Sequence, residues 1–191
     1  HEVLLLQKPT YEFAFDTETD SLDSMRANLV GISLCVEPGQ ACYIPLAHAA
    51  PGVAAQLPRD VVLDALRPLL ADPSKRKLGQ HGKYDLHVLR RHGIDVRGYA
   101  DDTMLESFVL NAGIARHDMD SLAQRHLGYQ TVKYEDVAGK GAKQIGFAQV
   151  ALDDATRYAA EDADITLRLH RAMLPKLQAE PALLSVYRDI E

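Results

Sequence analysis

Apolar and polar residues alternate in the first quarter of the chain, and this alternation predicts β-strands. The expected strands cover residues 11–17, 28–36 and 41–45. The last two flank Pro38-Gly39, a pair typical of a tight turn. The sheet is therefore expected to begin as an antiparallel meander.

From residue 59 onward, apolar residues recur at helical spacing and helices alternate with short strands. The further expected strands are 77–80 and 98–100, and the expected helices are 59–70, 83–92, 103–110, 119–127 and 152–174. Asp102 and Asp118 are expected to cap the two helices that follow them. We therefore predict an α/β fold with a central mixed five-stranded sheet, an antiparallel start and helices on both faces.

The composition, 47% hydrophobic and 25% charged over 191 residues, fits one globular domain with a sizeable core. No apolar run is long enough to cross a bilayer and no signal peptide is recognisable, so we expect a cytoplasmic protein that contacts no membrane. The net charge of −6 argues against a nucleic-acid coat protein but not against a nucleic-acid enzyme. Cys35 and Cys42 flank the turn and are expected to lie opposite each other as reduced packing residues.

Two acidic residues stand at the end of the first expected strand. Side chains two positions apart point to the same side of a strand, so Asp16 and Glu18 project together. Like charges held close together favour a divalent cation or a shared proton. The alternative is an acidic strand end with both carboxylates in water.

The last expected helix carries a carboxylate inside its apolar stripe. The stripe runs through Ala155, Ala159, Asp162 and Thr166, and Tyr158 lies on the same face. A carboxylate buried without partners costs several kcal/mol, which favours a paired or metal-bound Asp162. Asp164 falls on the opposite face, where we expect it to be solvated.

Asp85 shares a helix face with Val88 and Leu89, near the start of the helix, where an aspartate is usually a cap. With Asp85 added, there are four candidate carboxylates: Asp16, Glu18, Asp85 and Asp162. Acidic ligands without thiolates or clustered histidines favour hard cations, with Mg²⁺ or Mn²⁺ first.

Other catalytic motifs are missing or incomplete. The eight histidines include no His-Glu-x-x-His, and the segment 31–35 lacks the closing glycine of a nucleophile elbow. Gly139-Lys140-Gly141 lacks the spacing and the Ser/Thr of a phosphate-binding loop. It belongs to a polar, basic segment, 132–143, and is expected to form a mobile turn.

Three stretches resemble a known family: Asp16-Thr17-Glu18, His81-Gly82-Lys83-Tyr84-Asp85, and Tyr158-Ala159-Ala160-Glu161-Asp162. They are similar to the three motifs of the DEDD nucleases, in the subclass with tyrosine four residues before the last aspartate. From about residue 9 to its end, the chain resembles the 3′→5′ proofreading exonuclease domain of bacterial DNA polymerase I.

The resemblance implies a ribonuclease H-like fold and a two-metal hydrolysis of phosphodiester bonds. Asp16, Glu18 and Asp162 would hold one Mg²⁺, and Tyr158 would orient the attacking water. Asp16 would bridge to a second Mg²⁺ supported by Asp85, directly or through water. Mn²⁺ and Zn²⁺ are the expected substitutes, and the product would be a 5′-mononucleotide.

The same resemblance implies the substrate contacts. Leu22 and Tyr134 would wedge and stack against the terminal bases of a single-stranded 3′ DNA end. The positions that would contact the sugar-phosphate backbone are Gln80, His81, Tyr84 and Arg116. Two departures stand out, because the family usually has Asn at the position of His81 and often Phe at that of Tyr134.

The resemblance also implies a larger context. Residues 1–8 would end a truncated upstream segment, 9–175 would be the exonuclease domain, and 176–191 would lead into a polymerase domain of the same chain. The expected protein is a monomer associated with the bacterial nucleoid. Two rival functions are a catalytically silent scaffold of the polymerase and an RNA-trimming nuclease resembling ribonuclease D.

Overall fold

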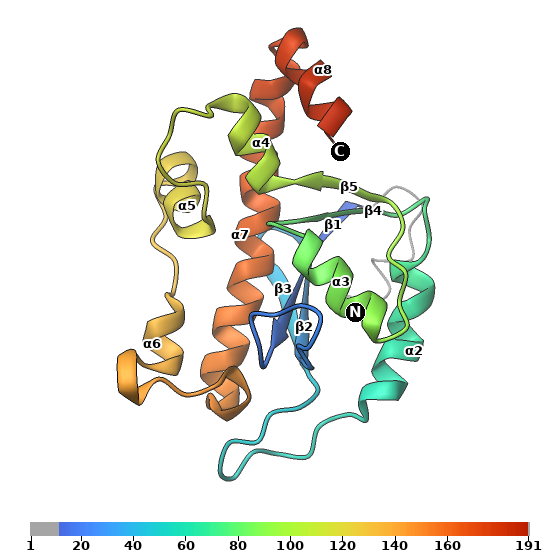
Figure 1. Cartoon of the computed structure of the whole chain (residues 1–191), viewed down its shortest axis with the longest axis vertical. Coiled ribbons are helices and arrows are strands. Elements are labelled where there is room, and N and C mark those ends of the chain that lie inside the picture. The colour runs from blue at the N-terminus through green and yellow to red at the C-terminus, as the bar shows by residue number, and fades with distance from the viewer. Residues whose placement is uncertain (1–11, 191) are drawn as a thin grey trace.

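The computed structural model describes residues 12–190, and its core is one mixed five-stranded sheet in the order β3-β2-β1-β4-β5 (Figure 1). The predicted upstream segment 1–8 lies outside the described residues. The strands are β1 Glu12–Thr19, β2 Leu29–Glu37, β3 Gln40–Pro45, β4 Arg76–Gly79 and β5 Tyr99–Asp102. β1, β2 and β3 pair antiparallel, whereas β4 and β5 continue the sheet in parallel from β1. The predicted fold class is confirmed.

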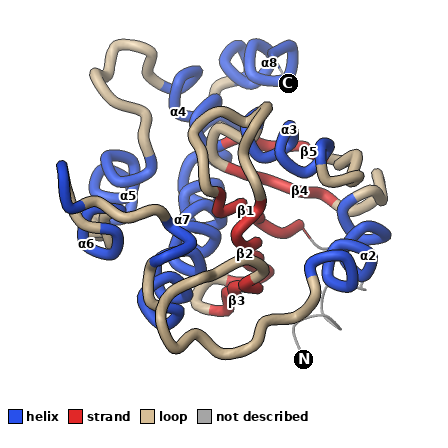
Figure 2. The backbone as a smooth tube through the Cα atoms, turned by 60° about the horizontal axis from the view of Figure 1, so that its bottom comes forward, coloured by secondary structure: helices blue, strands red, loops and turns tan. Residues whose placement is uncertain are grey.

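Helices cover both faces of the sheet, as Figures 1 and 2 show. One face packs against α2 Arg59–Leu70 and α3 Lys83–Arg91. The other face packs against the long helix α7 Leu152–Gln178, which contacts β1, β2, β3 and β4. The remaining helices are α4 Thr103–Leu110, α5 Met119–Leu127, α6 Tyr134–Ala138 and α8 Pro181–Ile190, with 3₁₀ turns at η1 Gly141–Lys143 and η2 Phe147–Gln149.

The alternation along β1 decides which face each side chain enters. Phe13 and Phe15 are buried in the layer formed with α2 and α3, whereas Ala14 packs against α7. Asp16 and Glu18 lie two and four residues after Ala14 and therefore point to the same face of the sheet. Both carboxylates are thus directed toward α7. A one-residue shift would have sent them into the opposite core.

Asp102 joins the starts of two helices. Its carboxylate caps α4 by accepting hydrogen bonds from the Met104 and Leu105 amides, at 2.9 and 3.4 Å. It also accepts from the amides of His81 and Gly82, at 3.1 and 2.9 Å, just before α3. The cap predicted at Asp102 is confirmed, and its second role fixes the loop that precedes Asp85.

Some sequence-based details were wrong. The polar, basic segment 132–143 contains α6 and η1, where no helix was expected. The last helix continues beyond 174 to Gln178, with Pro175 inside it. Cys42 pairs with Leu34 and Cys35 with Ala41 across β2 and β3. Because adjacent residues alternate faces, the two thiols lie on opposite sides of the sheet rather than opposite each other.

Candidate active site

Three of the four candidate carboxylates meet where β1 ends beside α7. One carboxylate oxygen from each of Asp16, Glu18 and Asp162 lies within 4.8 Å of the others. β1 contributes the first two and α7 the third, across a sequence separation of more than 140 residues. The group is half-buried, so water and small solutes can reach it from the cleft.

The electrostatics of this group fit a divalent cation. Burial, followed by the neighbouring carboxylates, raises the pKa values of Asp16 and Glu18 well above their ordinary range. Burial also raises the pKa of Asp162 to about 8, although a hydrogen bond from Tyr158 opposes the rise. One Glu18 oxygen, Oε1, is buried without a hydrogen-bond partner. Converging oxygen donors with unsatisfied negative charge are the ligand set that Mg²⁺ and Mn²⁺ prefer.

Asp85, from α3, contacts β1 at Thr17, the residue between Asp16 and Glu18. It is 4% exposed, and its Oδ1 accepts hydrogen bonds from the Thr17 amide at 3.1 Å and from the Thr17 hydroxyl. Burial, and then the charge of Asp16, raises its pKa. Asp85 therefore lies near enough to Asp16 to interact with it electrostatically, but outside the group of three converging oxygens.

Tyr158 stands one helical turn before Asp162, and its hydroxyl is hydrogen-bonded to that carboxylate. Burial and then the Asp162 charge raise the pKa of Tyr158 far above its usual value, so the hydroxyl keeps its proton. Because the hydroxyl proton is directed at Asp162, the hydroxyl oxygen is left to accept a hydrogen bond from a water bound in the cleft.

A cleft of about 370 Å³ opens over these residues. Three of the six predicted substrate contacts, Leu22, Tyr84 and Tyr134, line it. Leu22 is 99% exposed at its mouth, an unusual position for a large apolar side chain. The Tyr84 hydroxyl is tied to the Thr19 hydroxyl at 2.5 Å and to the Ser21 carbonyl, which fixes its ring in the wall.

The other three predicted contacts lie outside this cleft. Gln80 has both ends of its amide engaged, because Nε2 donates to the His117 carbonyl at 2.9 Å and Oε1 accepts from Thr103. His81 is exposed and adopts a left-handed backbone conformation with φ 58°. Asparagine, aspartate and histidine enter that conformation more readily than other residues with a side chain, so the backbone there accommodates the histidine.

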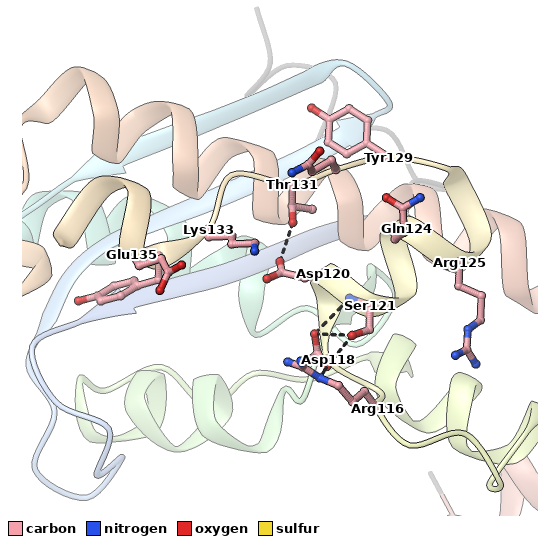
Figure 3. A pocket seen from close by; sticks show the side chains of 12 residues that line it. Arg116, Asp118, Asp120, Ser121, Gln124, Arg125, Tyr129, Thr131, Lys133 and Glu135 are labelled. Atoms are coloured by element: carbon pink, nitrogen blue, oxygen red, sulfur yellow. Dashed lines mark hydrogen bonds and ion pairs between the residues drawn. The ribbon is translucent and has the colours of Figure 1, made fainter. Parts of the chain in front are cut away.

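Arg116 borders a second, larger cleft of about 960 Å³ between α5 and α6 (Figure 3). Its Nε lies 2.8 Å from the Asp118 carboxylate, which also caps α5. Asp120, on the same wall, accepts a hydrogen bond from Thr131 at 2.6 Å. Tyr134 lines both clefts, so the larger one adjoins the carboxylate site.

Asp164 is not solvated, so that prediction was wrong. Its side chain is 16% exposed and accepts a 2.6 Å hydrogen bond from the Gly39 amide in the turn between β2 and β3. Arg168, one helical turn later, approaches it to 3.4 Å. The turn between β2 and β3 extends around α7 to the face on which Asp164 lies. Asp164 therefore fixes this turn to the helix.

Sequence reasoning missed a buried charge cluster near the other end of α7. His170 Nδ1 lies 2.5 Å from Glu106, and its Nε2 lies 3.6 Å from Glu12. Burial lowers the pKa of His170, but the hydrogen bonds to these carboxylates outweigh it and raise the value to about 10. Asp101 completes the cluster and accepts a 3.2 Å hydrogen bond from Tyr187 of α8. The glutamate inside an otherwise mostly apolar helix, 103–110, was the available signal.

The comparisons with known proteins agree with this geometry. The model of the 3′-5′ exonuclease family matches residues 2–178. DNA polymerase I of Pseudomonas aeruginosa is 57% identical over 180 residues, and that of Rhizobium leguminosarum is 45% identical over 195 residues. Each match covers 93% of this chain, which spans only about a fifth of the length of these relatives.

Solved structures show the same fold at low identity. Brucella melitensis NrnC matches with a TM-score of 0.67 at 21% identity, covering 96% of this chain and 83% of that one. Escherichia coli RNase D matches with a TM-score of 0.66 at 20% identity, covering 97% and 45% of the two chains. The shared ribonuclease H-like fold, together with the family match, defines a 3′-5′ exonuclease of that fold.

The chain belongs to the 3′-5′ exonuclease family and corresponds to the exonuclease domain of DNA polymerase I. The resemblance drawn from its three motifs is thereby confirmed. None of the helices in residues 12–190 combines the length and apolar character that a bilayer crossing requires.

Proposed function

We propose that this domain removes nucleotides one at a time from the 3′ end of single-stranded or frayed DNA, releasing 5′-mononucleotides. The observation that supports it best is the meeting of Asp16, Glu18 and Asp162 oxygens within 4.8 Å under an open cleft. In the longer protein, this activity would proofread for a polymerase domain of the same chain. That role rests on the DNA polymerase I relatives, which are about five times longer than this chain.

Asp16, Glu18 and Asp162 would hold one Mg²⁺, and Asp85 would support a second near Asp16, directly or through water. Bound cations would supply a nucleophilic water and stabilise both the attacking and the leaving oxygen. Their positive charge would also keep the three carboxylates ionised at neutral pH, against the burial that raises their pKa values.

The chain's own side chains would position the strand. Tyr158, protonated and bonded to Asp162, would orient the attacking water by accepting a hydrogen bond from it. Leu22 and Tyr134 would contact the terminal bases by wedging and stacking, which tolerates any base. Frayed ends cost less to unstack than paired ones, so such a site favours mismatched termini without reading sequence.

The test is a 5′-labelled single strand incubated with the domain and Mg²⁺, with EDTA and the Asp162→Asn variant as controls. We expect a ladder of products shortened from the 3′ end, absent in both controls. Lack of a ladder from a folded domain would support the scaffold function instead. Faster trimming of an RNA strand of the same sequence would support a ribonuclease.

A further inference from the structure

The aromatic ring of Phe147, in η2, packs against the two tyrosines that face the proposed substrate. Its centroid lies 5.8 Å from that of Tyr158, at an interplanar angle of 56°. It lies 6.2 Å from that of Tyr134, nearly parallel at 23°. The two tyrosine rings also meet edge to face at 6.0 Å, so the three rings form one contiguous aromatic group.

Phe147 is itself held from behind. It is 1% exposed, and it contacts Tyr43 edge-on at 6.4 Å and His48 at 5.6 Å. The Tyr43 hydroxyl is hydrogen-bonded to His48 Nε2 at 2.8 Å, which fixes both partners. Gly31 makes room for this arrangement, because a Cβ there would overlap the Tyr43 hydroxyl.

Tyr158 is only partly buried and lines the cleft. Its hydroxyl is anchored by Asp162, but a ring anchored at one end can still tilt about its side-chain torsions. The face and edge of Phe147 restrict that tilt for Tyr158 and support the Tyr134 ring from one side. Aromatic contacts of this kind add about 0.5–1.5 kcal/mol beyond the burial of area.

We propose that Phe147 is a positioning residue for the hydrolysis: it fixes the Tyr158 hydroxyl at the attacking water and the Tyr134 ring beneath a terminal base. This inference rests on the proposed nuclease function. Phe147 borders the cleft, but its role would be exerted through the two tyrosines.

The test compares Phe147→Leu with Phe13→Leu. Phe13 is equally buried but lies in the opposite core, with α2 and α3, so its variant controls for the loss of a buried ring. We expect Phe147→Leu to lower kcat on a 5′-labelled single strand by about tenfold and to raise KM by about threefold. Mn²⁺ affinity, measured by calorimetry, should stay unchanged because no carboxylate is altered. Phe13→Leu should lose stability while keeping kcat.

A double-mutant cycle with Tyr158→Phe separates positioning from general damage. If Phe147 acts through the Tyr158 hydroxyl, Phe147→Leu should cost less than about twofold in kcat once that hydroxyl is gone. An equal cost in both backgrounds, or an equal kcat loss in Phe13→Leu, would overturn the proposal.

A crystal structure of Phe147→Leu gives a second answer that needs no activity. Displaced Tyr158 and Tyr134 rings are expected, and rings in unchanged positions would refute the role even if the wild-type domain proved inactive. An inactive wild type with displaced rings would contradict the nuclease function alone.

Discussion

Replacing Asp162 by asparagine should stabilise the metal-free domain at pH 8 while abolishing cleavage. Burial raises the pKa of this carboxyl from its ordinary 3.8 to about 8. A raised carboxyl pKa contributes stability that is complete below the unfolded value, near 4, and is lost as the pH rises through 8. At pH 8 the unfolded chain holds this charge in water, whereas the folded domain must either bury it or bind a proton, so a neutral asparagine folds at a lower cost.

The size of the effect follows from the difference between the two pKa values. At about 1.4 kcal/mol for each pH unit, the interval from 3.8 to about 8 gives an upper limit of about 6 kcal/mol. Asp162 keeps part of its surface in the cleft, where water screens the charge. We therefore expect a gain of about 2 kcal/mol at pH 8 and less than about 1 kcal/mol at pH 5.

Urea unfolding in EDTA at the two pH values measures this gain. Adding Mg²⁺ should then stabilise the wild type but not the variant, because ligand binding stabilises only a state that binds it. The matched control is Asp164→Asn, two positions along the same helix. Asp164→Asn keeps an oxygen that can accept from the Gly39 amide but removes the charge from that acceptor and from the ion pair with Arg168, so this variant should lose about 1 kcal/mol at both pH values. An Asp162→Asn domain that is less stable than wild type at pH 8 in EDTA would refute the reasoning.

Three further predictions concern Tyr158, His170 and Leu22. Tyr158→Phe should lower kcat by about thirtyfold, with little change in Mn²⁺ affinity by calorimetry, because it removes the hydroxyl that orients the water but alters no carboxylate. Hydrogen bonds to Glu106 and Glu12 raise the pKa of His170 to about 10. The charged imidazolium therefore stabilises the fold fully below pH 6.5, the ordinary histidine pKa, and this stabilisation should disappear between pH 6.5 and 10. Urea midpoints across that range would show it, and His170→Leu should flatten the decline while costing about 3 kcal/mol at pH 6. Leu22→Ala should raise KM a few-fold and leave the melting temperature unchanged, since its side chain is 99% exposed; a drop in melting temperature would contradict this.

Local periodicity predicted most of the fold and brought out the carboxylates. The alternation predicted for the first strand placed Asp16 and Glu18 on one face, as the structure has them. The same reasoning singled out Asp162 as a charge in an apolar stripe. These predictions succeed because a strand or helix face is decided by near neighbours in sequence.

The contacts that sequence reasoning missed join distant segments. Asp164 was assigned to solvent because its partner Gly39 stands 125 residues away, in a turn whose reach past α7 no local pattern reveals. The pairing of His170 with Glu106 spans 64 residues. The hydrogen bonds of the Gln80 amide with Thr103 and with the His117 carbonyl were not foreseen either. Contacts of this kind depend on how helices and strands pack against one another. The periodicity within a single helix or strand does not determine that packing.

The approach of α7 to the sheet determines whether the site exists at all. Ala155, Ala159 and Ala163 are each 0% exposed and recur every four residues along the face that meets the sheet. Ala163 packs in one cluster with Ala14 of β1, so two small side chains meet where helix and strand come together. Larger residues there would separate the backbones, and the Asp162 oxygens could no longer lie within 4.8 Å of those of Asp16 and Glu18. The alanines add little apolar area of their own, but they bring the carboxylates close enough together for a shared cation to offset their repulsion.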